Sequence, residues 1–498
     1  MSDSYDIIII GGGVVGCMTA RFLSRYQLDI LLVEKRSDIG SVTSAANTAL
    51  IHPGYDAVSG SLKAKMNVIA NPIWTQLSEE LNFSFDRCGD YVVAVGDEEL
   101  PKLDALFKRG KANGVNGMSL VSGEEMRKRE PLINPDVSGA LFAETGGMCD
   151  PFGATLAAAE NAVMNGVEIL TDTEFRDFLL DKDRIVGVQT NNGDFRCRWV
   201  INAAGLYSDA VMHKAGVRPE FKITPRKGEY LILDRAESEL QSVYFPVPSE
   251  ISKGILATAT VHGNTILGPT AREQDDREDK SNTAAGLNEV LSGGKKLIPS
   301  VEPKHVIATF AGLRAAGNAL CETPGVDYGH DFIVEIPEKV KGFVNLGGIE
   351  SPGFTSSPAI ALLVIDLLRD AGEKLVEKTD WNPIRPARPR FRDMSTAERK
   401  QWIEKDPRYG RVVCRCENVT EGEIIAEIHS LIPATTYDAI KRRTWLGTGR
   451  CQGGFDMTRV TEILARELGV SPLTVSKKGS ASRLLVRPTK ILESSREN

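Results

Sequence analysis

The sequence has no hydrophobic run of the roughly 20 residues that a membrane-spanning helix needs. The closest stretch is 358–368, and Arg369 and Asp370 follow it directly. The first residues also lack the basic region of a secretory signal, and the apolar run Ile7–Ile10 stops at glycines. We therefore expect a cytoplasmic protein without a membrane span, which would reach a membrane only through a partner.

A surplus of positive charge is absent as well. The chain has 60 Lys and Arg against 67 Asp and Glu, which gives a formal net charge of -7 at pH 7. Because phosphate backbones are bound by basic surfaces, nucleic acid is not an expected partner. The 42% hydrophobic and 26% charged residues are ordinary for a globular protein, and 498 residues are enough for two or three domains.

Cysteine is scarce, with eight in the whole chain, and it is unevenly distributed. Five are scattered, as reduced and mostly buried thiols in a reducing compartment would be: Cys17, Cys88, Cys149, Cys197 and Cys321. The other three, Cys414, Cys416 and Cys451, cluster near the C-terminal end. This clustering indicates a separate role for them.

A strand–helix–strand unit is predicted at the start of the chain. Residues 5–10 are apolar and β-branched, as in a buried parallel strand. Residues 14–26 have helical spacing, and 29–33 form a second apolar stretch. Further strands of the same sheet are expected at 199–201 and 342–346, next to small or glycine-rich turns.

A second sheet and one more helix are predicted between and after these segments. Residues 91–95, 229–234 and 254–268 alternate in polarity, which favours an interleaved sheet with strands of its own. A helix is expected over 359–371, with Pro358 near its first turn, where proline is tolerated.

The turn after the first strand has a nucleotide-binding pattern. Gly11, Gly13 and Gly16 take the glycine positions of GxGxxG, which serve a tight turn, close approach to a diphosphate and helix–strand packing. The N-terminus of the helix then faces the phosphates. Glu34, at the end of the second strand, is placed to bind the hydroxyl groups of a ribose. The pattern predicts an adenine dinucleotide but does not distinguish FAD from NAD.

Seven further segments carry a resemblance to a known family. They are 43–47 (Thr-Ser-Ala-Ala-Asn), 51–55 (Ile-His-Pro-Gly-Tyr), 200–206, 225–230, 267–270, 310–314 and 348–355. In this order they resemble the amino-acid-oxidase superfamily of flavoproteins, and within it the glycerol-3-phosphate dehydrogenase/oxidase group. The resemblance runs from residue 5 to about 372 and favours FAD. It is less specific for the substrate, because the 2-hydroxyglutarate dehydrogenases of this superfamily share much of it.

The resemblance implies an α/β fold with a glutathione-reductase-type FAD-binding Rossmann domain, an interleaved antiparallel-sheet substrate domain and a small helical C-terminal cluster-binding domain. Within 1–375, the FAD part is expected at about 1–60, 145–215 and 335–375, and the substrate part at about 61–144 and 216–334. A proline- and arginine-rich linker is expected at 376–410, a ferredoxin-like domain at 411–475 and a basic tail at 476–498.

The implied contacts to FAD come from several parts of the sequence. They are Gly11, Gly13, Gly16, Glu34, Lys35, Thr43, Ser44, Asn47, Ala204, Gly205, Gly348, Ile349, Gly353, Phe354 and Thr355. Segment 348–355 is expected to close over the flavin ring. Backbone N–H groups at a helix N-terminus would stabilise the negative charge that a reduced flavin carries near N1. Whether FAD is bound covalently stays open.

Oxidation of an anionic alcohol needs a base for the hydroxyl proton and a fixed cation for the anion. His52 lies in the segment expected beside the flavin and is the candidate base. By resemblance, Arg314 holds the substrate anion and is a candidate catalytic residue. Further candidates for substrate binding are Lys253 and Ser351, and then Arg226 and Lys227.

The C-terminal cysteines resemble those of the 2Fe–2S domain found in bacterioferritin-associated ferredoxin. Cys414 and Cys416 form a Cys-x-Cys pair, and Cys451 begins the segment Cys-Gln-Gly-Gly-Phe-Asp. Relatives with a Cys-x4-Cys ending have their fourth cysteine where this chain has Asp456. The three thiolates and this carboxylate are the candidate ligands of a 2Fe–2S cluster. A site that holds zinc, or no metal, is the alternative.

These residues lead to one main hypothesis and two alternatives. The main hypothesis is FAD-dependent oxidation of sn-glycerol 3-phosphate to dihydroxyacetone phosphate by hydride transfer to flavin N5, with the electrons passed to a redox partner protein or to oxygen. The partner would be an NADH-linked flavoprotein or a small electron carrier. The alternatives are a 2-hydroxyacid dehydrogenase of the same fold, and an FAD-containing electron-transfer subunit without catalytic activity.

Overall fold

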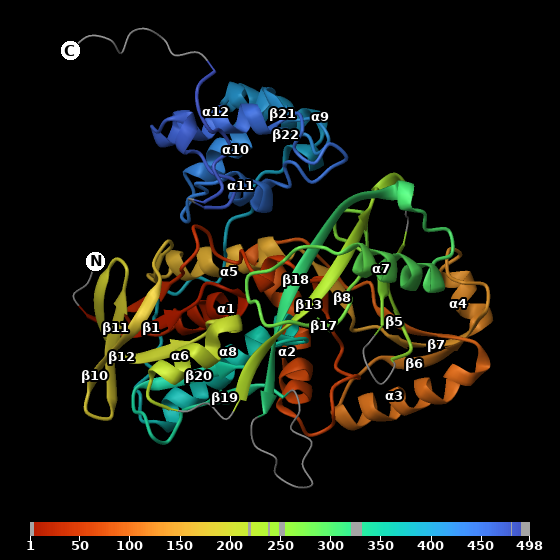
Figure 1. Ribbon diagram of the computed structural model, residues 1–498, viewed down its shortest axis with the longest axis horizontal. Helices are drawn as coiled ribbons and strands as arrows, with labels where there is room; N and C mark the ends of the chain where they lie inside the picture. Colours follow the sequence, from red (N-terminus) through yellow and green to blue (C-terminus); the bar gives the residue numbers. More distant parts are fainter. Residues whose placement is uncertain are drawn as a thin grey trace. The chain divides into compact units, whose positions relative to one another are not determined.

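The computed structural model describes residues 4–217, 221–237, 240–248, 254–319, 331–479 and 481–489. The chain forms two compact units, Met1–Lys35 with Ile39–Ala387 and Arg36–Asp38 with Arg388–Asn498. Figure 1 shows the ribbon of each, coloured along the sequence. None of the helices in the described ranges combines the length and the hydropathy required to cross a membrane.

A mixed sheet with a parallel centre forms the first part of the first unit, as the sequence predicts. Within the described residues it has eight strands, and the parallel ones follow the order β9–β2–β1–β12–β20. The parallel strands are β1 (Ser4–Ile10), β2 (Ile30–Val33), β9 (Glu168–Leu170), β12 (Gly193–Asn202) and β20 (Phe343–Gly347), and the others are β10 (Phe175–Asp181), β11 (Arg184–Thr190) and β19 (Ile333–Glu335).

Burial on both faces explains the unbroken apolar sequence of β1. Ile8 and Ile10 point into a cluster that includes Val211 and Met212 of α6 (Ser208–Lys214). Ile7 and Ile9, which point to the other face, are fully buried as well. The helix that follows β1, α1 (Val14–Leu23), packs against α5 (Pro151–Met164) and α8 (Gly353–Asp370).

A mostly antiparallel sheet forms the second part of the first unit, which confirms the interleaved sheet. In the described ranges it has nine strands in the order β17–β13–β16–β15–β14–β5–β7–β6, with β18 paired to β13. Their bounds are β5 (Asp90–Val95), β6 (Met118–Ser122), β7 (Val137–Ala143), β13 (Phe221–Leu233), β14 (Val243–Pro246), β15 (Leu256–Ala259), β16 (Thr265–Gly268), β17 (Arg272–Glu273) and β18 (Val306–Ala319). The long strands β13 and β18 run side by side across the unit (Figure 1).

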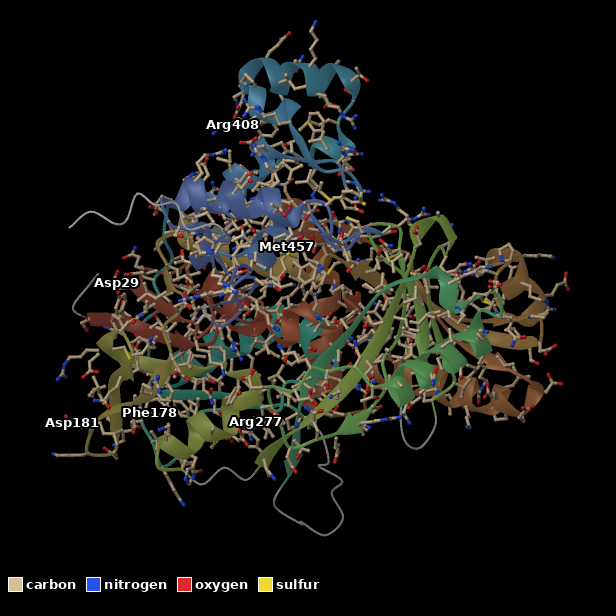
Figure 2. All side chains as sticks on the ribbon, turned by 45° about the horizontal axis from the view of Figure 1, so that its top comes forward. Asp29, Phe178, Asp181, Arg277, Arg408 and Met457 are labelled. Carbon is tan, nitrogen blue, oxygen red and sulfur yellow. The ribbon has the colours of Figure 1, made fainter. Side chains whose placement is uncertain are left out.

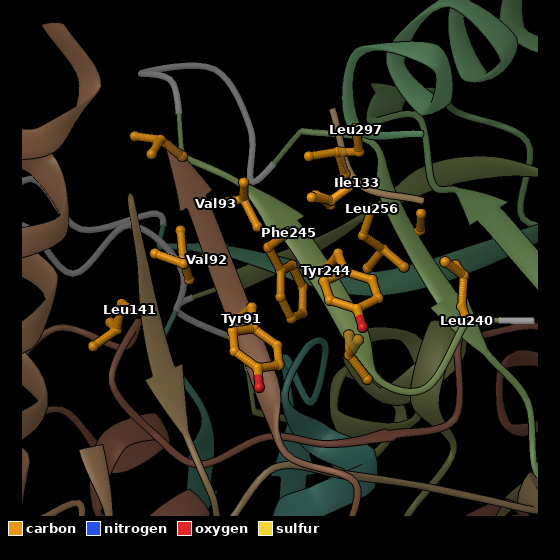
Figure 3. Close-up of a cluster of buried hydrophobic side chains, with 14 of the residues drawn as sticks. Tyr91, Val92, Val93, Ile133, Leu141, Leu240, Tyr244, Phe245, Leu256 and Leu297 are labelled. Atoms are coloured by element: carbon orange, nitrogen blue, oxygen red, sulfur yellow. The ribbon is translucent and has the colours of Figure 1, made fainter. Parts of the chain in front are cut away.

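A cluster of buried side chains holds this sheet together. Figure 3 shows Tyr91 of β5 beside Tyr244 of β14, with Leu256 and Leu297 close by. The two tyrosine rings stack with their centroids 5.6 Å apart. The other elements of the first unit are α2 (Leu62–Leu81), α3 (Leu100–Asn113), α4 (Gly123–Arg129) and α7 (Ala284–Leu297), with a small sheet of β3 (Leu50–Ile51), β8 (Gly147–Cys149) and β4 (Phe85–Asp86).

Helix α8 begins earlier than the sequence indicates. It starts at Gly353 rather than after Pro358, so the prediction that this proline lies near the first turn is wrong. A proline inside a helix removes a donor and disturbs the carbonyls of the preceding turn. Here the Phe354 carbonyl accepts from the Ser357 hydroxyl at 2.8 Å, and the Thr355 carbonyl accepts from the indole N–H of Trp74 at 2.8 Å. These side-chain donors let the helix continue through the proline.

The second unit is small and mainly helical, as predicted. It contains α9 (Thr396–Lys405), β21 (Val412–Cys414), β22 (Val419–Thr420), α10 (Glu421–Ile428), α11 (Tyr437–Thr444) and α12 (Met457–Leu468). Ile424, Ile440 and Leu464 bring the last three helices into one core. Thr420 and Glu423 form a capping box at the start of α10, which satisfies backbone donors that the helix itself leaves open.

The range 376–410, predicted as a linker, contains packed structure. Arg385 is 6% exposed, and its guanidinium donates to the Glu160 carboxylate and the Leu81 carbonyl. The boundary between the units falls after Ala387, and α9 follows within the same range. A buried arginine is retained only where it is paired. Because Glu160 is far away in sequence, local composition gave no sign of this pairing.

Replacing Tyr244 by phenylalanine is expected to lower the free energy of unfolding of the first unit by about 1–3 kcal/mol. The Tyr244 hydroxyl donates at 2.8 Å to Glu130, a carboxylate that is 1% exposed and would lose a donor. Urea denaturation with FAD in excess measures the change. Tyr91→Phe is the matched control, because its hydroxyl lies 3.4 Å from the Arg129 guanidinium at a less buried place. Equal losses in both variants would contradict this account.

Candidate active site and cluster site

Two glycines in or beside the turn after β1 allow a closer backbone approach than any side chain would, Gly16 to the end of β1 and Gly11 to the residue after β12. A Cβ atom on Gly16 would lie 2.0 Å from the Gly11 carbonyl oxygen, and one on Gly11 would lie 2.5 Å from that of Ala203. Gly11 also has a φ angle of +110°, which favours glycine. Gly13 differs, because the nearest atom to its Cβ would be the Ser44 hydroxyl at 3.4 Å. The turn therefore leaves room at Gly13 for a diphosphate.

Glu34 follows β2 and stays beside the glycine turn. Its carboxylate accepts from the N–H of Gly12 at 2.8 Å and so lies next to the turn that the sequence predicts to bind a dinucleotide. Lys35 turns elsewhere. Its ammonium lies 3.6 Å from the centre of the Tyr207 ring and 3.4 Å from the Glu278 carboxylate. Contacts of Glu34 and Lys35 with FAD both stay predictions, and of the two it is Glu34 that contacts the glycine turn.

Segment 43–47 touches both the glycine turn and the second sheet. The Ser44 hydroxyl accepts from the N–H of Val14, the first residue of α1, at 2.9 Å. The Thr43 hydroxyl donates to the Leu313 carbonyl on β18 at 2.9 Å. The Asn47 amide donates to the carbonyls of Thr43 and Ser44 at 3.2 and 2.9 Å and thereby closes the turn. The segment thus holds a hydroxyl at the helix N-terminus where phosphates are expected.

Ala204 and Gly205 extend the same edge of the sheet after β12. The N–H of Ala204 donates to the Asn202 side chain at 3.2 Å. Gly205 has a φ angle of +53°, and a Cβ atom there would meet nothing within 4 Å. The predicted nucleotide contacts at Gly11, Glu34 and Ala204 therefore follow the carboxyl ends of β1, β2 and β12, where a doubly wound sheet binds its ligand.

Segment 348–355 connects β20 to α8 and lies against β18. A Cβ atom on Gly317 of β18 would lie 3.0 Å from the Cα atom of Gly348, so the two chains are in close contact. Ile349 covers Gly353, the first residue of α8. Phe354 stacks on Trp74 with ring centroids 5.1 Å apart, which gives it a packing role between α8 and α2.

His52 is fixed through its backbone. Its N–H donates to the Thr355 hydroxyl at 3.0 Å, and its carbonyl accepts from the amides of Asn67 and Asn71 at 2.8 and 2.9 Å. The imidazole lies beside Phe245 of β14, with ring centroids 5.9 Å apart. Sequence reasoning missed both asparagines, although their spacing of four on a helix is the signal that places them on one face.

Arg314 lies on β18 directly opposite Arg226 on β13. Its terminal nitrogen donates to the Thr270 carbonyl at 2.7 Å, and its Nε is buried without a hydrogen-bond partner in the described part of the chain. Burial lowers the pKa of Arg314, and Arg226 acts in the same direction, while Tyr230 and Glu350 oppose this. Like charges directly opposite each other repel, so an anion bound here would relieve both repulsion and desolvation.

Sequence reasoning missed the ion pair of Lys63 with Glu350. The Lys63 ammonium lies 2.7 Å from the Glu350 carboxylate, and these side chains are only 13% and 8% exposed. Asp331 accepts from the N–H groups of Leu62 and Lys63 at 2.8 and 2.9 Å. The pair of Lys63 with Glu350 ties the start of α2 to segment 348–355, and Asp331 ties it to the residues before β19. Glu350 stands in a motif that the sequence singled out, but nothing local marks Lys63 as its partner.

The remaining substrate candidates differ in position. The Lys227 ammonium is 2.7 Å from Asp279 and 3.1 Å from the Ser281 carbonyl, so its charge is already neutralised. Ser351 is half-buried and follows Glu350 in the segment before α8. Lys253 lies outside the described residues.

The segments that carry the candidate residues contact one another in the first unit. His52 contacts segment 348–355 through Thr355, and Arg314 interacts electrostatically with Glu350 of the same segment. Segment 43–47 contacts the helix that follows the glycine turn through Ser44 and β18 through Thr43. Hydrogen bonds thus connect the backbone of His52 to segment 348–355, and the strand of Arg314 to the glycine turn through segment 43–47.

The second unit holds the candidate cluster ligands. Cys414 and Asp456 are both 1% exposed, while Cys416 and Cys451 are half-buried. Burial raises the pKa of the Cys414 thiol to about 12. The side chains form two neighbouring pairs, Cys414 with Asp456 and Cys416 with Cys451. In the described residues, no three His, Cys, Asp or Glu side chains gather around one point as ligands of a single metal ion would.

Comparison with known proteins gives two family matches. Residues 6–367 match the family described as FAD dependent oxidoreductase, and residues 412–466 match the BFD-like [2Fe-2S] binding domain. A glycerol 3-phosphate dehydrogenase from Caloramator mitchellensis is 42% identical over 487 residues, which cover 98% of this chain and 99% of that protein. An L-2-hydroxyglutarate dehydrogenase from Nematostella vectensis is 29% identical over 73% of this chain and 90% of its own length.

A solved structure is similar over most of the chain. The dithionite-reduced L-α-glycerophosphate oxidase from Mycoplasma pneumoniae with FAD bound has a TM-score of 0.71 and 32% identity. The match covers 78% of this chain and all of that one. The shared fold is therefore that of the two interleaved sheets.

Two glycine variants are expected to separate folding from nucleotide binding. Gly16→Ala should prevent FAD binding and destabilise the first unit, because its Cβ atom would lie 2.0 Å from a backbone oxygen. Gly13→Ala should keep the fold, since 3.4 Å is an ordinary contact, but weaken FAD binding about tenfold or more by filling the diphosphate space. Circular dichroism reports the fold, and an FAD titration reports affinity. Unchanged affinity in Gly13→Ala would place the diphosphate elsewhere.

Proposed function

Because this chain belongs to the FAD dependent oxidoreductase family, we propose that it oxidises sn-glycerol 3-phosphate to dihydroxyacetone phosphate. The observation that carries the proposal is the full-length similarity to the glycerol 3-phosphate dehydrogenase of Caloramator mitchellensis, which includes the C-terminal domain. The similarity to the Mycoplasma pneumoniae L-α-glycerophosphate oxidase supports it over most of the chain.

The buried guanidinium of Arg314 explains how a phosphate would be held. Arginine binds phosphate with two parallel hydrogen bonds, and the Nε of Arg314 is a donor that no described residue uses. Arg226, opposite in register, adds a second positive charge to the same pair of strands. A dianionic phosphate between these charges is bound more strongly than an uncharged alcohol, which fixes the carbon chain of the substrate relative to His52.

His52 is the proposed acceptor of the hydroxyl proton. FAD, when bound, supplies the acceptor for the hydride that leaves the alcohol carbon. The three backbone hydrogen bonds of His52 fix where its imidazole projects, and a neutral imidazole takes up a proton near pH 7. Thr355, Asn67 and Asn71 are therefore positioning residues, because they act on the substrate through His52.

The C-terminal domain supports a further proposal about the electrons. Its family binds a 2Fe–2S cluster, which transfers single electrons between proteins. We propose that a partner protein, either an NADH-linked flavoprotein or a small electron carrier, receives the electrons in preference to oxygen. A membrane-bound partner would also bring this protein to the membrane. Oxygen uptake as fast as flavin reduction would contradict this proposal.

The flavin of the purified protein is expected to bleach when sn-glycerol 3-phosphate is added without oxygen. Bleaching by glycerol or by sn-glycerol 1-phosphate should be at least about a hundredfold slower. Glycerol lacks the phosphate, and sn-glycerol 1-phosphate is the mirror image, so the hydrogen on its secondary alcohol carbon would not point at the flavin when the phosphate is bound. Anaerobic stopped-flow absorbance measures the rates. Faster bleaching by L-2-hydroxyglutarate would favour the 2-hydroxyacid alternative, and no bleaching by any alcohol would favour a subunit without catalytic activity.

Arg314 and His52 are expected to affect different steps. Arg314→Gln should raise the dissociation constant for sn-glycerol 3-phosphate about a hundredfold, because it removes a charge-assisted pair. His52→Gln should slow flavin reduction at saturating substrate about 10²- to 10⁴-fold, as loss of a general base does. The dependence of the reduction rate on substrate concentration separates the two constants.

Lys227→Gln is the matched control for Arg314→Gln. It removes a positive charge from the neighbouring position of the same strand pair, but its ammonium already pairs with Asp279. Both constants should stay within about twofold of the native values. An equal loss of affinity in the two variants would mean that net charge, and not the guanidinium of Arg314, binds the substrate.

A further inference from the structure

Asp456 is a buried carboxylate with one oxygen unused. It is 1% exposed, and its Oδ1 accepts from the Tyr437 hydroxyl at 2.7 Å. Its Oδ2 is buried and has no hydrogen-bond partner among the described residues. An unsatisfied buried oxygen on a carboxylate costs considerable free energy. A positively charged group bound at Oδ2 would remove this cost.

The carboxylate does not serve the helix that follows it. Asp456 immediately precedes α12, whose first residue, Met457, is labelled in Figure 2. Aspartate at this position normally accepts from the first N–H groups of the helix. Asp456 makes no such bond, whereas Thr420 and Thr436 cap α10 and α11 through their side chains. The orientation of Asp456 is therefore set by something other than helix capping.

The three cysteines and this carboxylate form two neighbouring pairs of side chains. Asp456 lies beside Cys414, and Cys416 lies beside Cys451. Backbone N–H groups face the sulfur atoms, those of Gly447 and Glu417 at Cys414 and those of Gly453 and Phe455 at Cys451. Such donors stabilise thiolates and tune iron–sulfur clusters. Two pairs of ligands match a 2Fe–2S cluster, in which each iron takes two protein ligands.

We propose that Asp456 is the fourth protein ligand of a 2Fe–2S cluster in this domain and that it coordinates iron through Oδ2. Cys414, Cys416 and Cys451 supply the three thiolates. Tyr437 holds the carboxylate through Oδ1 and is a positioning residue. An oxygen ligand is chemically acceptable to iron, and a hydrogen bond to its second oxygen is the usual outer support of a carboxylate ligand. The proposal does not depend on the identity of the alcohol substrate.

The glycines of the loop before α12 support the role of Tyr437. A Cβ atom on Gly447 or on Gly453 would lie 2.4 Å from the Tyr437 hydroxyl oxygen. Both glycines have positive φ angles, +72° and +87°. The loop therefore closes tightly around this hydroxyl and leaves it little freedom other than to donate to Asp456. The hydrogen bond thus fixes the direction in which Oδ2 points.

The test compares full-length variants that are prepared and reconstituted anaerobically with iron and sulfide. The native protein should contain about two iron and two sulfide per chain. Asp456→Asn should lose at least about tenfold in iron, because a neutral amide is a poor iron ligand. Asp456→Cys should keep its iron, show stronger thiolate-to-iron absorption and give a different electron paramagnetic resonance spectrum after reduction. Tyr437→Phe should keep iron but shift the reduction potential.

Asp438→Asn is the matched control, because Asp438 is a nearby carboxylate that pairs with Lys477 at 2.9 Å. Its iron content and spectrum should equal the native ones. FAD content serves as the reference in every sample, since the first unit is unchanged. The proposal would be overturned if the native protein held no cluster while the Asp456→Cys variant held one. Identical spectra for the native, Asp456→Asn and Asp456→Cys proteins would overturn it as well. If Asp456→Asn fails to fold, the comparison between the spectra of the native and the Asp456→Cys proteins still tests whether Asp456 is a ligand.

Discussion

The close contact between Gly16 and the carbonyl of Gly11 is the constraint on which the first unit depends. A Cβ atom on residue 16 would lie 2.0 Å from that oxygen, so only glycine lets α1 begin so soon after the end of β1. Its N-terminus then faces the edge of the sheet where β2 and β12 also end, and the partial positive charge of the helix is available to phosphates. Helices α5 and α8 pack on α1, so the same contact also sets the helical layer.

Strand β18 contacts both of the segments that are predicted to bind FAD. A Cβ atom on Gly312 would lie 1.9 Å from the Ala46 carbonyl, and the next carbonyl along β18 accepts from Thr43. Further along the same strand, Gly317 touches Gly348 at the start of the segment before α8. Arg314 lies between these contacts. The guanidinium is therefore held at a fixed distance from both segments that are expected to contact FAD, which is what hydride transfer requires of a substrate anchor.

The second unit combines a hydrophobic core with a buried polar pair. Its aliphatic side chains come from three short helices, and two of these are capped by threonine side chains. The Tyr437–Asp456 pair is buried in the same unit, and the glycine loop closes around it. A carboxylate and a thiolate carry the same single negative charge, so aspartate in place of cysteine would change the donor atom from sulfur to oxygen and not the charge.

The sequence by itself determined the features that rest on local spacing: the apolar strand β1, the glycine turn, Glu34 and the Cys-x-Cys pair. Each of these features depends on residue types at fixed spacings along the chain, so it can be recognised from the sequence before the structure is known. The tertiary structure alone decided the start of α8, the packing of the supposed linker and the pairing of Lys63 with Glu350. In each case the deciding partner is remote, as with Trp74 and Thr355, 281 residues apart, or Arg385 and Glu160, 225 residues apart. Hydrogen bonds and ion pairs form between groups that are close in space, and spacing along a sequence does not record that closeness.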